Sequence, residues 1–142
     1  MKTKLTTLTT LTLATLTLFA ALAPSLRAQS QLDTSQASAY IGSWVLEFTS
    51  DMGPFAMSVE IRDMGGKVAA TLSQADMGMQ QEVTDITKAG ESLALAFAGD
   101  FQGQAFAAVI TLEPPAGNAS AVYFDVNDGQ FGMSGTGTKS GS

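Results

Sequence analysis

The sequence predicts an all-β protein, and within that class an eight-stranded antiparallel up-and-down barrel. From residue 42 onward, apolar and polar residues alternate with a period of two in short segments. Turn residues separate these segments at intervals of roughly 12 residues, and no segment keeps a helical period. Pairing the last strand with the first would remove exposed sheet edges, which favours a closed barrel. A flattened β-sandwich is the alternative.

The first predicted strand, residues 42–50, contains the only tryptophan of the chain. Trp44, Leu46 and Phe48 fall on one face, and polar residues fall between them. The other predicted strands span residues 55–63, 67–74, 79–87, 92–99, 104–112, 120–126 and 130–138. Strand 79–87 has the weakest pattern, because Gln80, Gln81 and Glu82 are consecutive polar residues. Gly135 and Gly137 in the last strand are typical of a crowded or bent position.

The N-terminal residues have the layout of a secretory signal peptide. Lys2 and Lys4 precede an apolar run that ends at Pro24, and small residues follow. We therefore expect a signal peptide at 1–28, a flexible leader at 29–39, the barrel domain at 40–139 and a tail at 140–142. The chain has no cysteine, so a lipoprotein anchor is not expected, and the predicted location is secreted or periplasmic.

The charge balance restricts the partners. Beyond residue 28, four basic residues remain against thirteen acids, a net charge of −9. Such an acidic chain repels phosphate backbones and anionic membranes, so we expect neither nucleic acid nor a membrane as partner. The chain also lacks histidine, which excludes Ser-His-Asp triads and Cys or His zinc sites.

Gly42-Ser43-Trp44, at the start of the first predicted strand, resembles the G-x-W signature of lipocalins and other calycins. The segments Gly53-Pro54-Phe55, Val59-Glu60-Ile61, Gly65-Gly66-Lys67-Val68 and Gly90-Glu91-Ser92-Leu93 resemble those of small secreted bacterial lipocalin-like domains. The resemblance covers about Gly42 to Lys139 and implies a β-barrel. It implies no particular ligand.

A small barrel either fills its interior with its own side chains or leaves room for one small ligand. Our first hypothesis is a binding module that holds a small apolar ligand in its mouth. The candidate ligand-binding residues are Trp44, Phe48, Met57, Met77, Met79, Phe97, Phe106 and Phe124. Trp44 has an alternative role as a plug that closes one end of the barrel.

The tripeptide Asp-Met-Gly occurs at 51–53, 63–65 and 76–78. These methionines could form an adaptable apolar rim or a soft-metal site at one end of the barrel. Alternatively, Asp and Gly satisfy the turns and Met is incidental. We predict no metal and no cofactor.

The outward faces of the predicted strands from 92 to 126 are rich in alanine. This surface is a candidate for self-association or a protein partner through Ala94, Ala96, Ala105, Ala107 and Val109. A structural or interaction protein with a filled barrel is therefore our second hypothesis. A hydrolytic enzyme using Glu47 or Glu60 is the third. We predict no enzyme, because both carboxylates fall on the outer face.

Overall fold

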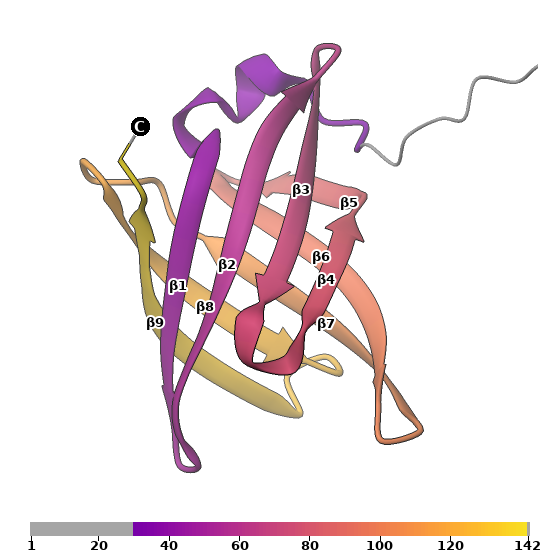
Figure 1. The fold of residues 1–142 in the computed structure, drawn as a ribbon. Helices are drawn as coiled ribbons and strands as arrows, with labels where there is room; N and C mark the ends of the chain where they lie inside the picture. Colours follow the sequence, from indigo (N-terminus) through magenta and orange to yellow (C-terminus); the bar gives the residue numbers. More distant parts are fainter. Residues whose placement is uncertain (1–29, 142) are drawn as a thin grey trace, which may run out of the picture.

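The computed structural model describes residues 30–141, which form one antiparallel sheet of nine strands wound into a nearly closed barrel (Figure 1). The all-β class and the antiparallel barrel predicted from the sequence are confirmed. The strands are β1 (Gly42–Ser50), β2 (Gly53–Met64), β3 (Lys67–Gln74), β4 (Met79–Val83), β5 (Asp85–Ala89), β6 (Ser92–Phe101), β7 (Gln104–Leu112), β8 (Ala119–Val126) and β9 (Phe131–Lys139).

The sheet closes between its first and last strands, as the sequence predicts. Its order is β4-β3-β2-β1-β9-β8-β7-β6-β5, and β1 pairs with β9 from Trp44↔Lys139 to Phe48↔Gly135. The two ends of the sheet are therefore β4 and β5, which follow each other in the chain. A narrow seam remains where β4 approaches β6.

The seam explains why there are nine strands and not eight. The predicted strand 79–87 is divided at Thr84, where the chain leaves β3 and joins β6. Val83 and Ile86 are both buried, although residues three apart lie on opposite faces of a continuous strand. The chain must bend between them. Across the seam, the Gln81 side-chain amide donates a 2.7 Å hydrogen bond to the Ala98 carbonyl.

One end of the barrel is closed, and we call the opposite end open. At the closed end, Trp44 is fully buried and its indole Nε1 donates a 2.8 Å hydrogen bond to the Tyr40 carbonyl. The Tyr40 hydroxyl donates to the Glu91 carbonyl at 2.6 Å. The Lys139 ammonium lies 5.4 Å from the Trp44 ring. These contacts place Trp44 as a plug.

Residues 30–40 cover the closed end, through the short 3-10 turns η1 (Thr34–Gln36) and η2 (Ser38–Tyr40) (Figure 1). The Ser30 amide donates to the Val68 carbonyl, and Lys67 forms a 2.6 Å ion pair with Asp33. A flexible leader was predicted at 29–39. In its described part, 30–39, pairing of Asp33 with Lys67 and the burial of Ala37 attach the segment to the barrel. The predicted signal peptide, 1–28, lies outside the described residues.

Alternating inward side chains build one apolar core. Its fully buried members include Leu46, Ile61, Leu72, Leu95 and Ile110, so the closed half of the barrel is filled with side chains. Within residues 30–141, no helix is both long enough and apolar enough to span a membrane.

Candidate functional site at the open end of the barrel

The open end carries an apolar cavity of about 380 Å³. The cavity is bordered by the ends of β2, β3, β4, β6, β7 and β8. Its lining comprises Phe55, Met57, Gln74, Met77, Met79, Phe97, Asp100, Phe101, Gln104, Ala105, Phe106, Phe124, Val126 and Asn127. We call it the mouth pocket. Its size lies within the range of pockets that enclose small molecules.

Phenylalanines from different strands form the inner wall of the mouth pocket. Phe124 lies 5.8 Å from Phe48, 6.4 Å from Phe55 and 6.3 Å from Phe97 between ring centroids. Phe97 meets Phe106 edge to face at 6.4 Å. Tilted and edge-to-face rings at these distances stabilise one another, so the wall is preformed.

Most of the predicted ligand-binding residues come together here. Met57, Met77, Met79, Phe97, Phe106 and Phe124 all line the mouth pocket. Phe48 does not line it, because it is buried in the layer below and contacts Phe55 and Phe124. Trp44 lies at the closed end with no exposed surface, so its placement among the pocket residues was wrong. Its indole nitrogen is held by the Tyr40 carbonyl instead.

Several residues of the mouth pocket were not predicted from the sequence. Phe55 and Val126 follow the inward alternation of their strands, so the pattern itself could have identified them. Gln74 also falls on the inward face, after Val68, Ala70 and Leu72. It was not predicted, because only the apolar residues of the predicted strand 67–74 were assigned to the interior.

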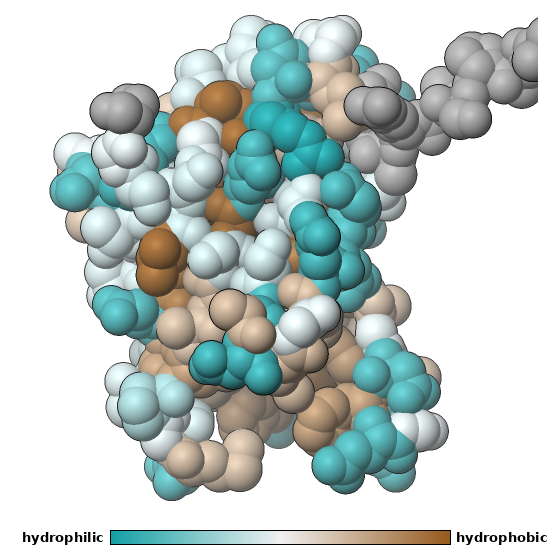
Figure 2. Space-filling view, in the orientation of Figure 1, coloured by the Kyte–Doolittle hydropathy of each residue, from teal (hydrophilic) through white to brown (hydrophobic). Residues whose placement is uncertain are grey.

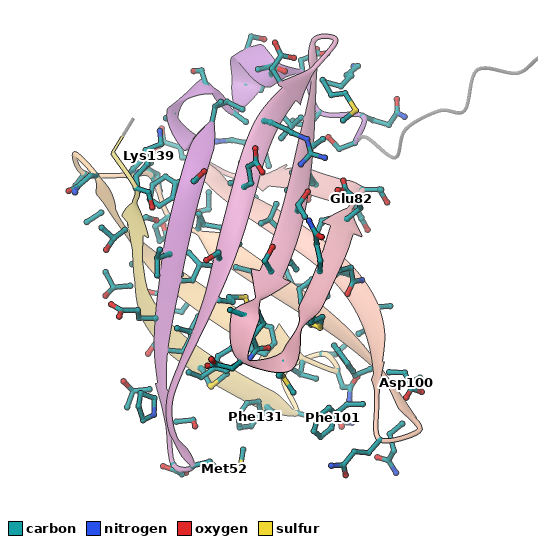
Figure 3. All side chains as sticks on the ribbon, in the orientation of Figure 1. Met52, Glu82, Asp100, Phe101, Phe131 and Lys139 are labelled. Carbon is teal, nitrogen blue, oxygen red and sulfur yellow. The ribbon has the colours of Figure 1, made fainter. Side chains whose placement is uncertain are left out.

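Large apolar side chains are exposed around the open end. Met52 is 91% exposed, and Met77, Phe101 and Phe131 are also largely exposed. Figure 3 shows Met52, Phe101 and Phe131 at the lower end of the barrel, far from Lys139. Figure 2 shows the same end as moderately apolar surface interrupted by hydrophilic residues. The pocket therefore opens onto an apolar rim.

The three Asp-Met-Gly repeats do not gather at one end. Met52 and Met77 lie at the open end, in the β1–β2 and β3–β4 connections. Met64 ends β2 at the closed end, because successive hairpin turns of an up-and-down barrel alternate between its ends. Of the two alternatives, the arrangement with all three methionines around one end is therefore not formed. Gly53, Gly65 and Gly78 all have positive φ, in agreement with the alternative in which the repeats serve turns. Among residues 30–141, no group of three or more His, Cys, Asp or Glu side chains is arranged to hold a metal ion.

Charge is distributed unevenly along the barrel. The connections at the open end carry Asp51, Asp76 and Asp128, Asp100 lies near the end of β6, and these connections hold no basic residue. The basic residues of the described chain are Arg62, Lys67, Lys88 and Lys139, each on or near a connection or strand end at the closed side. The mouth is consequently an acidic surface around an apolar pocket.

A polar cluster lies on the outer surface, away from the mouth. Arg62 donates to Thr71 at 2.6 Å and pairs with Glu82 at 2.8 Å, and the Thr71 hydroxyl donates to Glu82 at 2.7 Å. The hydrogen bond from Thr71, helped by Arg62, lowers the pKa of Glu82. The three side chains of this cluster form hydrogen bonds with one another, which indicates a structural role.

A second, larger depression of about 790 Å³ lies on the outside of β6 and β7. Ala96, Ala98, Ala107 and Val109, from the predicted alanine-rich face, line it together with Asp85 at the seam. The predicted neighbours are confirmed, because Ala96 pairs with Val109 and Ala98 with Ala107. Its walls are short side chains, whereas phenylalanines enclose the mouth pocket. We therefore take the mouth pocket as the candidate site.

Comparison of the chain with models of protein families, with curated proteins and with solved structures gives no significant match. The function is therefore inferred from the geometry of the barrel.

Proposed function

We propose that this chain is a non-catalytic, lipocalin-like binding module, secreted or periplasmic, whose open end takes a small apolar ligand. The single observation that carries the proposal is the mouth pocket, with its phenylalanine wall and its volume of about 380 Å³. A barrel stabilised only by its own packing has no need of such a space, since filling it would bury more apolar surface.

The arrangement of the two ends supports the same proposal. The closed end is filled by Trp44 and Tyr40 and covered by the N-terminal segment, so a ligand has one route of entry. The exposed Met77 and Phe101 lie where that route begins. Methionine at the rim suits ligands of varied shape, because its thioether side chain is flexible and polarisable.

A filled-pocket variant tests this proposal. Val126→Phe adds a ring at the pocket wall, and Val45→Phe makes the same change on the outer face of β1. Titration calorimetry with decanol, a neutral apolar probe, should show saturable binding to the wild-type protein and to Val45→Phe. Val126→Phe should bind at least about tenfold more weakly, which corresponds to about 1.4 kcal/mol. Absence of saturable binding by the wild-type protein would refute the proposal.

The outer depression favours a second candidate, self-association through the alanine-rich face. Ala107 is exposed there, and Ala96 and Val109 are half-buried. Of the other residues predicted for this contact, Ala94 is half-buried and Ala105 is exposed, and both lie outside the depression. A second copy could bury these short side chains without much loss of side-chain entropy. Sedimentation velocity over a concentration series should show a dimer that Ala107→Glu abolishes and that Ala56→Glu, on the outer face of β2, leaves intact. A monomer at every concentration would refute self-association.

A further inference from the structure

The mouth pocket contains a buried amide that has no protein partner. Gln74 is only 7% exposed and lines the pocket, yet its side chain forms no hydrogen bond with any described residue. No side-chain nitrogen or oxygen of the described residues is both fully enclosed and unpartnered, so the amide retains access to the pocket space. Water can reach such an amide, and a polar group of a ligand can take the place of that water.

The surroundings of Gln74 determine the charge of that polar group. Asp100 lines the same pocket, and Asp51, Asp76 and Asp128 lie on the connections of the open end. Among the described residues no basic side chain lies on these connections. The resulting field attracts cations and repels a carboxylate. A ligand whose polar group is anionic, such as a fatty acid, would therefore meet unfavourable charge at the entrance.

From these two independent observations we propose that the mouth pocket selects apolar chains that end in a protonated amine. This inference rests on the proposed function and specifies its ligand class. The apolar chain lies against Phe97, Phe106 and Phe124. The ammonium lies at the entrance, where the Gln74 carbonyl accepts one of its N–H groups and Asp100 supplies the nearest carboxylate lining the pocket.

Four probes with a ten-carbon chain separate the contribution of charge from that of the N–H group: decylammonium, decyltrimethylammonium, decanol and decanoate. Titration calorimetry below their micellar concentrations should rank decylammonium first and decanoate last. We expect decylammonium to bind about tenfold more tightly than decanol at low salt, and less so at high salt. Decyltrimethylammonium, which carries the charge but no N–H group, should bind with intermediate affinity.

Substitutions of Asp100 and Gln74 test whether these residues cause the preference for the amine. In the wild-type protein the Gly103 amide donates a 2.9 Å hydrogen bond to Asp100 Oδ1. Asp100→Asn keeps an oxygen that can accept this bond and removes the charge. It should weaken decylammonium several-fold and decanol much less. Glu91→Gln removes one negative charge at the closed end and should change the affinity for neither decylammonium nor decanol. Gln74→Leu should weaken decylammonium and spare decyltrimethylammonium, with Gln74→Met as a second apolar replacement.

The outcomes separate this inference from the proposed function. If decanol binds but decylammonium binds no more tightly, or decanoate binds equally well, the amine preference is wrong and the apolar site stands. If none of the four probes binds the wild-type protein, both proposals fail. If Asp100→Asn and Glu91→Gln weaken decylammonium equally, the effect comes from net charge, and the assignment to the rim is overturned.

Discussion

Gly135 lies directly opposite Phe48 where β9 closes on β1, and no larger residue fits there. A Cβ atom on Gly135 would stand 2.1 Å from the Glu47 carbonyl oxygen and 2.8 Å from a ring carbon of Phe48. Both distances are far below van der Waals contact. The absence of a side chain at Gly135 thus lets the barrel close directly beneath the mouth pocket.

Gly135→Ala should therefore destabilise the barrel by about 1–3 kcal/mol, because the β1–β9 pair must separate locally to admit the methyl group. Urea unfolding measures the change. Gly132→Ala is the matched control on the same strand, since its Cβ would stand 3.0 Å from the flexible Asp125 carboxylate and at ordinary contact distance, 3.9 Å, from the Phe124 carbonyl oxygen. Equal stability of the two variants would contradict the close approach of β9 to β1.

Trp44 should be important for stability and unimportant for ligand binding. Trp44→Ala removes a fully buried side chain and should cost about 3–5 kcal/mol. Trp44→Phe, which keeps a ring but loses the hydrogen bond to Tyr40, should cost less and should bind decanol as the wild-type protein does. A large loss of decanol affinity in a folded Trp44→Phe variant would contradict the assignment of Trp44 to the closed end.

Much of the fold could be predicted from the sequence, because apolar residues alternate with polar residues along a half-buried strand. β1 and β7 have the predicted bounds for this reason. β3 also has the predicted bounds, although both of its faces are largely buried. The break at Thr84 could not be predicted from composition, since Gln80 to Glu82 give no alternation to follow. Its one signal is the spacing of Val83 and Ile86, which puts two buried residues three positions apart.

The candidate site was predicted less completely than the fold. Alternation assigns a residue to the interior but does not give its height along the barrel. Trp44 and Phe124 both point inward, yet only Phe124 reaches the mouth pocket. Height depends on the stagger between neighbouring strands, which is a property of the pairing register. The exposure of Phe131 was missed for the same reason, because Phe131 keeps the inward pattern but lies beyond the core.

Glu82→Gln should lower stability in a pH-dependent way. The Glu82 pKa lies below its ordinary value of 4.5 in the folded protein, so the carboxylate stabilises the fold above the unfolded-state pKa. That contribution is lost as the pH falls through the lowered folded-state pKa. Solvent screens this partly exposed pair, so we expect a loss of only about 0.2–1 kcal/mol at neutral pH.

Urea unfolding of wild-type protein and Glu82→Gln at neutral pH, and again well below the ordinary pKa, measures this difference. The two proteins should converge at the acidic pH. Glu47→Gln, on the outer face of β1, is the control and should show little effect. A difference between wild type and Glu82→Gln that persists in acid would contradict the role of the charged carboxylate.

Gln81 should control the opening of the seam. Gln81→Glu places a carboxylate, which cannot donate, opposite the Ala98 carbonyl and should cost about 1 kcal/mol. Hydrogen exchange should then accelerate in β4 and in the part of β6 that β5 does not cover. Gln80→Glu, on the exposed neighbouring position, should leave exchange unchanged. The same exchange rates in both variants would show that the Gln81 bridge does not hold the seam.

The occupancy of the mouth pocket is tested most directly by methyl NMR of the methionines during titration with decanol. We expect saturable shifts of the Met57, Met77 and Met79 methyl signals, which come from side chains that line the pocket. The methyl signal of Met64, at the closed end, should not move. Methionine signals that never change, or a Met64 signal that shifts as much as the other three, would contradict an apolar binding site at the open end.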